Sequence, residues 1–311
     1  MSRRLCTQVT DLCPVSRSTY GYVPNLPGNA ILLALFASCA LFHLGFGIYH
    51  RSWAFLTALA GGAAMEAIGY GGRLMMRPNV WDPNAFKIQI CCLVLAPSLI
   101  AAGIYLSLKH IIIYAGPEGS RLKPHLYTWI FISCDVFSIV IQAGGGGIAA
   151  AAGATNIKLL NTGNNLIITG IAVQVVTMAV CGLLALDYYV RHQKAKKAGN
   201  ATFSAYEGKA APAISFTKFK IFVGAEVFAY ITVLIRCIYR LPEMAGGWGN
   251  PLMRNEKEFL ILDGMMIGLA VLAFTVFHPG IWFPPMTGRW QNKRKAMDAA
   301  EAPLSDSDQK A

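Results

Sequence analysis

Long apolar stretches dominate this sequence and leave few folds open to it. Seven stretches are each long enough to cross a lipid bilayer as an α-helix, which takes about 20 mainly apolar residues. They cover residues 29–49, 53–74, 86–113, 126–152, 165–189, 219–239 and 259–278. Only 14% of the residues are charged, whereas average soluble domains are about 25% charged. The sequence therefore predicts an all-α polytopic membrane protein, a bundle of seven transmembrane helices without a separate soluble domain.

Basic residues are distributed unequally between the two sides of this bundle. Sixteen Lys and Arg lie in the first, third and fifth loops and the carboxyl-terminal tail, and nine lie on the other side. The positive-inside rule then places the amino terminus outside and the carboxyl terminus in the cytosol, although three arginines in the amino-terminal tail favour the reverse. We divide the chain into an extracytosolic tail (1–28), a transmembrane domain (29–285) and a basic cytosolic tail (286–311). The net charge of +11 follows from this topology and from attraction to membrane lipids, so no nucleic-acid partner is expected.

The eight cysteines leave one question open. Six lie inside the predicted helices, where thiols pack as small residues. Cys6 and Cys13 lie in the amino-terminal tail, where either a disulfide or two free thiols fit the sequence. The sequence has no CxxC pair, and we expect neither a metal nor a cofactor. In the longest loop, Asn200-Ala201-Thr202 is a glycosylation sequon that this topology leaves unused in the cytosol.

Ionisable residues inside the predicted helices mark the candidate site. Each costs about 2.5 kcal/mol or more within a bilayer, so such residues are functional candidates. Several share one helix face at i, i+3 or i+4, and i+7 spacing, as Glu66, Tyr70 and Arg73 do. The candidate substrate-binding cavity comprises Glu66, Tyr70, Arg73, Asp135, Ser138, Gln142, Glu226, Arg236 and Asp263, and its outer mouth comprises Arg240, Glu243 and Glu256.

Two interpretations of these charges remain open. In the first, they form a buried ion-pair network that fixes helix register, with Glu66 opposite Arg236 and Asp135 opposite Arg73. In the second, they line a cavity. Four acids and two arginines lie within the spans, so two negative charges are unmatched. Those acids either carry protons or attract a cation, for which an amphiphile with an amine head group would be suited.

Two further features have structural explanations. The run "QAGGGGIAAAAGA" in the fourth helix permits either a close helix contact or an unwound segment that lines a cavity. The six histidines all map to the cytosolic half or boundary of the bundle. We assign them to solvation and helix capping rather than to metal or haem ligation.

The sequence resembles a family of fungal seven-helix lipid-translocating exporters linked to aminocholesterol resistance and sphingoid-base release. The resemblance rests on "YGYVPNLPGN", "EAIGYGGR", "DVFSIVIQAGGGG", "RCIYRLPEMAGG" and "HPG", which follow the expected order from about residue 20 to residue 280. It implies a seven-helix protein of the plasma membrane, or alternatively of an endomembrane. Such proteins are associated with sphingoid bases, toxic amphiphiles and in some cases porphyrins. The resemblance transfers no catalytic residues, so the candidate site rests on the charge pattern alone.

Transport is the leading functional hypothesis. We expect a transporter, not an enzyme, that moves an amphipathic lipid or toxic amphiphile similar to a sphingoid base, a sterol or a drug. No GxxxxGK[ST] motif occurs, so this chain is not expected to hydrolyse ATP. A seven-helix receptor or sensor of lipids or stress is one alternative, and porphyrin or haem transport is another. An intramembrane enzyme ranks last, because the HExxH and GxGD signatures are absent.

Overall fold

The computed structural model describes residues 6–116, 119–152, 156–197, 215–247 and 249–292. These residues contain no β-strand, and the all-α prediction is confirmed. The long helices are α1 (Leu26–His50), α2 (Trp53–Met75), α3 (Pro83–Ala115), α4 (Pro124–Ala152), α5 (Ile157–Lys197) and α6 (Phe216–Ala245). The last long segment combines α7 (Glu256–Glu258), the π-helix η3 (Phe259–Met265) and α8 (Met266–Val276). Short helices η1 (Val15–Arg17), α9 (Pro279–Trp282) and η4 (Pro284–Met286) complete the described fold.

Local capping chemistry sets where the helices begin and end. Asn25 caps α1 by accepting a hydrogen bond from the Gly28 amide at 2.9 Å, and Asp82 caps α3 in the same way through the Asn84 amide at 2.8 Å. A proline in the first turn of each helix needs no amide partner, which favours helix initiation there. The left-handed backbone of Arg51, with φ of 53°, ends α1 and turns the chain into α2.

Six helices in the described part are long and apolar enough to cross a membrane, namely α1, α3, α4, α5, α6 and the segment Glu256–Trp282. Helix α2 is not among these six, although its 23 residues give it enough length. It packs between α1 and α3, and 13 of its residues are buried. A helix shielded from lipid on most of its surface needs less apolar character than one that faces lipid. The predicted count of seven spans therefore depends on α2.

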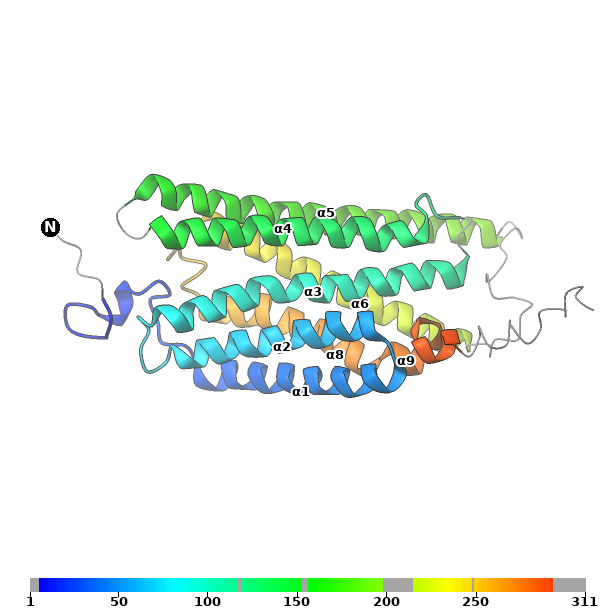
Figure 1. The fold of residues 1–311 in the computed structure, drawn as a ribbon, viewed down its shortest axis with the longest axis horizontal. Coiled ribbons are helices and arrows are strands. Elements are labelled where there is room, and N and C mark those ends of the chain that lie inside the picture. Colours follow the sequence, from blue (N-terminus) through cyan, green and yellow to red (C-terminus); the bar gives the residue numbers. More distant parts are fainter. Residues whose placement is uncertain (1–5, 117–118, 153–155, 198–214, 248, 293–311) are drawn as a thin grey trace, which may run out of the picture.

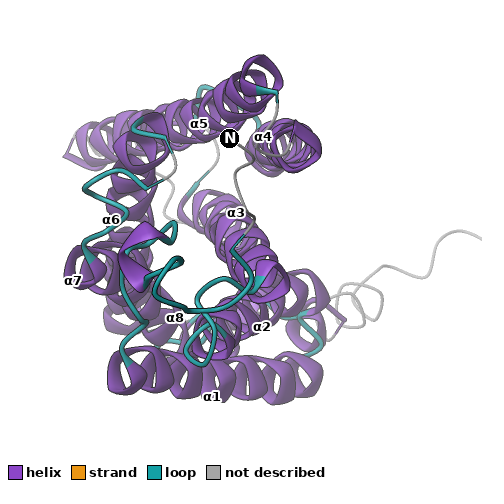
Figure 2. Ribbon diagram, turned by 90° about the vertical axis from the view of Figure 1, so that its left-hand side faces the viewer, coloured by secondary structure: helices purple, strands orange, loops and turns teal. Residues whose placement is uncertain are grey.

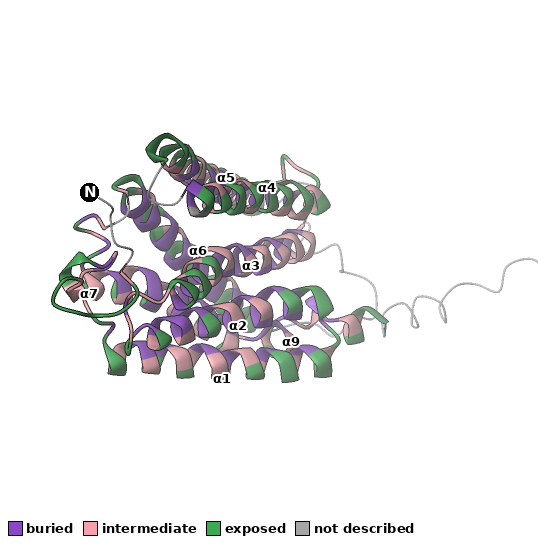
Figure 3. Ribbon diagram, turned by 60° about the vertical axis from the view of Figure 1, so that its left-hand side comes forward, coloured by how far each residue is buried: buried purple, intermediate pink, exposed green. Residues whose placement is uncertain are grey.

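The helices lie side by side along the long axis of the molecule (Figure 1). Viewed along this axis, α4 and α5 form one edge of the bundle and α1 lies at the opposite edge (Figure 2). Buried surfaces face the interior and exposed surfaces face outward (Figure 3). Large apolar side chains such as Leu41, Trp129 and Leu183 are more than half exposed on those outer surfaces, which is typical of helices that face lipid.

The glycine run produces a close contact between two helices. Helix α4 continues through Gly144–Gly147 without unwinding. A Cβ atom added at Gly145 would lie 2.7 Å from the Gly163 carbonyl oxygen of α5, whereas one at Gly146 would meet nothing within 4 Å. Of the two expectations for this run, the described residues therefore match the close helix contact.

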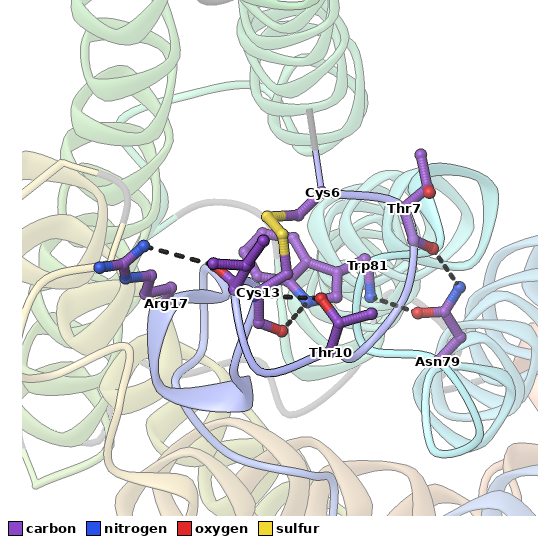
Figure 4. Close-up of a disulfide and its surroundings, with 8 residues drawn as sticks. Cys6, Thr7, Thr10, Cys13, Arg17, Asn79 and Trp81 are labelled. Atoms are coloured by element: carbon purple, nitrogen blue, oxygen red, sulfur yellow. Dashed lines mark hydrogen bonds between the residues drawn. A yellow bond between two sulfur atoms is a disulfide. The ribbon is translucent and has the colours of Figure 1, made fainter. Parts of the chain in front are cut away.

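Residues 6–25 form an N-terminal cap over one end of the bundle, which we call the cap end (Figure 1). Cys6 and Cys13 are joined by a disulfide, which answers the question that the sequence left open. The short loop between α2 and α3 holds this disulfide loop in place (Figure 4). Asn79 donates a hydrogen bond to the Thr7 carbonyl at 2.7 Å, and the Trp81 indole donates to the Cys13 carbonyl at 3.3 Å.

Two segments that figure in the sequence predictions lie outside the described residues. The Asn200 sequon falls in 198–214, and most of the carboxyl-terminal tail falls in 293–311. Their predicted cytosolic position therefore stays a prediction.

Candidate functional site

The outermost layer of the site, nearest the cap end, is built around the buried guanidinium of Arg73. It forms an ion pair with Glu256 at 3.1 Å. Its Nε donates to the Asn29 side-chain oxygen at 2.9 Å, and another nitrogen donates to the Tyr22 hydroxyl at 2.8 Å. Asn29 in turn donates to Glu256 at 3.0 Å. This layer joins α1, α2, α7 and the N-terminal cap.

Aromatic rings enclose the same guanidinium. The Cζ atom of Arg73 lies 4.2 Å from the ring centre of Phe259 and 5.3 Å from that of Tyr20. The Tyr20 hydroxyl accepts a hydrogen bond from Gln89 on α3 at 2.7 Å. Burial raises the pKa of Tyr20 to about 12, and the nearby Arg73 charge offsets only part of this effect. Burial also raises the pKa of Tyr22, so both cap phenols are neutral hydrogen-bonding groups at neutral pH.

A second layer of charges lies beneath the first. Arg236 and Arg240, one turn apart on α6, both contact Asp263, with Nε to Oδ1 distances of 2.8 and 2.9 Å. Arg240 also pairs with Glu243 at 2.7 Å, and Arg236 donates to the Leu93 carbonyl of α3. Asp263 lies in the π-helix η3. Single π-helical turns often occur at functional sites, because the wider turn redirects side chains.

Glu66 and Tyr70, one turn apart on α2, lie beside this second layer. Glu66 is only 1% exposed, and in the described part of the chain neither of its carboxylate oxygens has a hydrogen-bond partner of standard geometry. Asp263 and Arg236 lie within range of a direct charge interaction with Glu66. The Tyr70 hydroxyl is also buried without a partner, and it packs where Gly264 has no side chain.

Asp135 lies deeper in the bundle, on α4. It is 2% exposed and has no ion pair in the described part of the chain. The Tyr105 hydroxyl of α3 faces its carboxylate, although neither group completes a hydrogen bond of standard geometry. The thiols of Cys181 on α5 and Cys237 on α6 lie close to the Asp135 carboxylate.

Asp135, Ser138 and Gln142, which we predicted to line one cavity, face different neighbours in the structure. Ser138 donates a hydrogen bond to the Gly170 carbonyl of α5, and Gln142 donates to the Ser138 hydroxyl at 2.9 Å. A Cβ atom at Gly170 would lie 2.5 Å from the Gln142 side chain. Ser138 and Gln142 thus lie in the contact between α4 and α5, apart from the charged layers near the cap end.

Glu226 is the third buried acid without a partner among the described residues. It lies on α6, is 4% exposed, and neither oxygen has a hydrogen-bond partner of standard geometry. The Ser107 hydroxyl of α3 is within its reach, but this hydroxyl donates to the Gly103 carbonyl at 3.0 Å.

The ion pairs differ from the pairing that we expected for a structural network. Arg73 pairs with Glu256 rather than Asp135, and Arg236 pairs with Asp263 rather than Glu66. Arg240 and Glu243, which we expected at an outer mouth, are buried within the second layer. The arginines are thus paired with other acids than those we expected. Whether the twelve candidate residues bind cargo stays a prediction.

Sequence reasoning missed several residues that complete the site. They are uncharged polar or aromatic residues that contact the charged groups of the site, and they comprise Tyr20, Tyr22, Asn29, Tyr105 and Phe259. A signal for three of them was available, because Tyr20, Tyr22 and Asn29 lie in the stretch "YGYVPNLPGN", on which the family resemblance partly rests. The others belong to residue types that are common in membrane helices and at their boundaries.

Two histidines form polar contacts at the end of the bundle opposite the cap end. The ring of His43 lies 3.1 Å from the Thr275 hydroxyl, and His278 accepts a hydrogen bond from the Gly280 amide at 3.1 Å. Within the described ranges, no group of three or more His, Cys, Asp or Glu residues is placed to hold a metal ion.

Comparison with known protein families shows to which family the chain belongs. The profile of the family described as "RTA1 like protein" matches residues 59–286, which is well over half of the chain. The chain belongs to the RTA1-like family. Among its relatives is the sphingoid long-chain base transporter RSB1 of Saccharomyces cerevisiae, 31% identical over 86% of this chain and 75% of the relative.

Two further yeast relatives match this RTA1-like chain. Protoporphyrin uptake protein 1 of Saccharomyces cerevisiae is 29% identical over 69% of this chain and 65% of its own length. Protein RTM1 of Saccharomyces cerevisiae is 26% identical over 69% of this chain and 64% of its own length. No solved structure matches the chain. Together with the six apolar helices, this membership makes the RTA1-like protein a multi-pass membrane protein.

Proposed function

We propose that this protein moves a single-chain lipid with an amine head group across or out of the membrane, without an ATPase of its own. In this proposal α2 is the seventh span. Residues 1–28 are extracytosolic, 29–285 form the transmembrane domain, and 286–311 are cytosolic. The plasma membrane is the proposed location.

One observation supports an amine head group above all. Asp135 lies inside the bundle with no cation from the described residues beside it, and a hydroxyl from Tyr105 faces the same carboxylate. A protonated amine would supply the missing positive charge and up to three hydrogen-bond donors. The name of the relative RSB1 describes cargo of this chemistry, a sphingoid long-chain base.

The topology has two independent supports. A disulfide between Cys6 and Cys13 is typical of an oxidising, extracytosolic compartment. The excess of Lys and Arg in the odd-numbered loops and the carboxyl-terminal tail favours a cytosolic position for those segments. Cysteines introduced at residues 195–210 should resist an impermeant thiol reagent in intact cells and react after permeabilisation. Labelling in intact cells would overturn the topology.

A liposome assay with purified protein tests the cargo. Labelled sphingoid base, phospholipid and protoporphyrin are compared in separate arms, and we expect movement of the base without added ATP. The porphyrin arm is included because of the relative named protoporphyrin uptake protein 1. Movement of porphyrin or phospholipid but not of the base would contradict the proposal.

The Asp135→Asn variant tests the role of the carboxylate. Asn keeps the shape of the side chain but cannot carry a negative charge, so we expect base movement to fall at least tenfold while the protein stays folded. Asp187→Asn is the matched control, because Asp187 forms its ion pairs with Arg121 and Arg191 at an exposed position. Full transport by Asp135→Asn would remove Asp135 from the mechanism.

A further inference from the structure

The three unpartnered acids lie at successive depths along the inside of the bundle. Glu66 lies beside Arg236, and Glu226 lies ten residues before Arg236 on α6, which is about 15 Å along the helix. Asp135 lies between these two acids. The Cys237 thiol is close to both Asp135 and Arg236, and the Cys181 thiol is close to both Asp135 and Glu226.

We propose that Glu66, Asp135 and Glu226 form a proton path through the bundle, and that the protein exchanges protons for its cationic cargo. This inference rests on the proposed function. A bare carboxylate in a low-dielectric interior is unstable, so it needs either a proton or a cation. Cargo and proton therefore compete for the same carboxyl.

Glu66 is the end of the proposed path nearest the cap, and the groups around it are suited to proton transfer. On α6 it faces Arg236 and Arg240, on η3 it faces Asp263, and on α3 it faces Cys92. The two arginines are already held by Asp263. They can therefore stabilise a transient negative charge on Glu66 without being committed to a direct ion pair with it.

The centre of the path is Asp135. The titratable groups that face it are Tyr105 on α3, Cys181 on α5 and Cys237 on α6. All are neutral in their ordinary states, so no fixed positive charge competes with a proton or with an amine for this carboxylate. The buried Tyr105 hydroxyl, which has no other partner, can donate to the carboxylate or accept from its acid form.

The far end of the path is Glu226. It faces Ser107 on α3 and Cys181 on α5, and Ser107 also contacts the sulfur of Met286 at 3.8 Å. The short helix that contains Met286 lies at the end of the bundle opposite the cap end (Figure 1). A proton entering from this end would therefore reach Glu226 before Asp135.

Each exchange balances in charge and in atoms. The acid form of Asp135 gives one proton to the path as one ammonium cation binds, and the resulting carboxylate takes up one proton when the cation leaves. The site is neutral before and after each step. Downhill movement of one cation in one direction thus moves one proton in the other.

The test uses liposomes that contain a trapped pH-sensitive dye and a permanently charged N-trimethyl sphingoid base. This probe cannot carry a proton by itself, whereas an ordinary amine can cross as its neutral form and change the pH without the protein. With the wild-type protein, inward movement of the probe should make the lumen more alkaline, with about one proton leaving for each cation. Movement of the probe without any change of internal pH overturns the proposal.

This inference assigns Glu66 and Glu226 to proton transfer and only Asp135 to cargo binding, which replaces the prediction that all three line the cargo cavity. Variants test that assignment. Glu66→Gln and Glu226→Gln should slow net cation movement and proton release at least tenfold. Exchange of labelled for unlabelled probe across the membrane should keep its rate, because this exchange moves no net proton. Asp187→Asn is the control and should match the wild type in both assays.

The outcomes also separate this inference from the proposed function. If neither net movement nor exchange occurs in the wild type with the probe or with ordinary sphingoid base, the proposed function fails. If both occur and the internal pH stays constant, the proposed function holds and proton exchange is refuted. If Glu226→Gln is folded but loses exchange as well, Glu226 belongs to the binding site and the path is refuted there.

Discussion

Asp263 and Arg240 join the last helical segment to α6 through two contacts. One carboxylate oxygen lies 2.9 Å from Nε, and the other lies 3.4 Å from a terminal nitrogen. The same carboxylate also holds Arg236 at 2.8 Å. A single acid thus links two buried arginines, with Glu243 as a second negative charge beside Arg240.

We predict that Asp263→Asn destabilises the protein by about 3–5 kcal/mol, because it leaves buried guanidinium charge uncompensated. The melting temperature in detergent and the abundance in the membrane should both fall. Asp187→Asn should leave both nearly unchanged, since exposed ion pairs contribute little. A wild-type melting temperature for Asp263→Asn would show that the second layer does not depend on this acid.

The two adjacent glycines Gly145 and Gly146 give a matched pair of variants. Gly145→Ala should separate α4 from α5 and lower the melting temperature, because its Cβ would lie 2.7 Å from the Gly163 carbonyl oxygen. Gly146→Ala has open space and should be neutral or stabilising by up to about 1 kcal/mol. Equal melting temperatures for the two variants would contradict the close contact. Thermal unfolding in one detergent makes the comparison.

The sequence predicted the helices well and the ion pairs poorly. Hydropathy and length identify a membrane helix because the bilayer imposes both. The partner of a charge depends on how the helices rotate and pack, and no periodicity along one helix records that. Arg73, for instance, pairs with Glu256 across a separation of 183 residues.

The N-terminal cap shows a second limit of sequence reasoning. From the sequence, residues 20–29 served only as one of the stretches on which the family resemblance rests. That Tyr20 and Tyr22 would enclose a guanidinium follows from the fold of the whole bundle. By contrast, the glycine run in α4 predicted one of two structures, a close helix contact or an unwound segment. The contact at Gly145 is the first of these.

The buried phenol of Tyr20 predicts a pH dependence of stability. Below pH 10 it is neutral in both the folded and the unfolded chain. Its pKa in the folded protein is about 12, against 10.0 ordinarily, so between these values only the unfolded chain releases the proton. The stability that Tyr20 contributes should therefore be fully present below pH 10 and fall by up to about 2–3 kcal/mol as the pH rises to 12.

Tyr20→Phe provides the comparison for this titration. It removes the ionisable group, so the difference in unfolding free energy between wild type and variant should be constant below pH 10 and shrink above it. Denaturant unfolding in detergent at each pH gives this difference. A difference that stays constant up to pH 12 would mean that Tyr20 titrates like an ordinary tyrosine.

Replacing Cys6 and Cys13 together by serine should loosen the N-terminal cap. The disulfide closes a short loop and contributes about 2–3 kcal/mol to the order of that segment. Protease added to intact cells should cut residues 6–25 faster in the variant than in the wild type. Cys91→Ser is the control, because Cys91 is an exposed free thiol. Equal cutting in all three proteins would show that the hydrogen bonds from Asn79 and Trp81 hold the cap without the disulfide.

The cap also bears on the route that a lipid could take. Residues 6–25 cross the end of the bundle and bury Tyr20 against Gln89 and Arg73, so the cap covers the first layer of the site at this end. Under the proposed function, a single-chain lipid would then leave sideways between two helices, with its head group inside the bundle and its tail in the hydrocarbon. In that case, the thickness of the bilayer and the ordering of its acyl chains would set the speed of export, and sterol content would regulate the protein without binding to it.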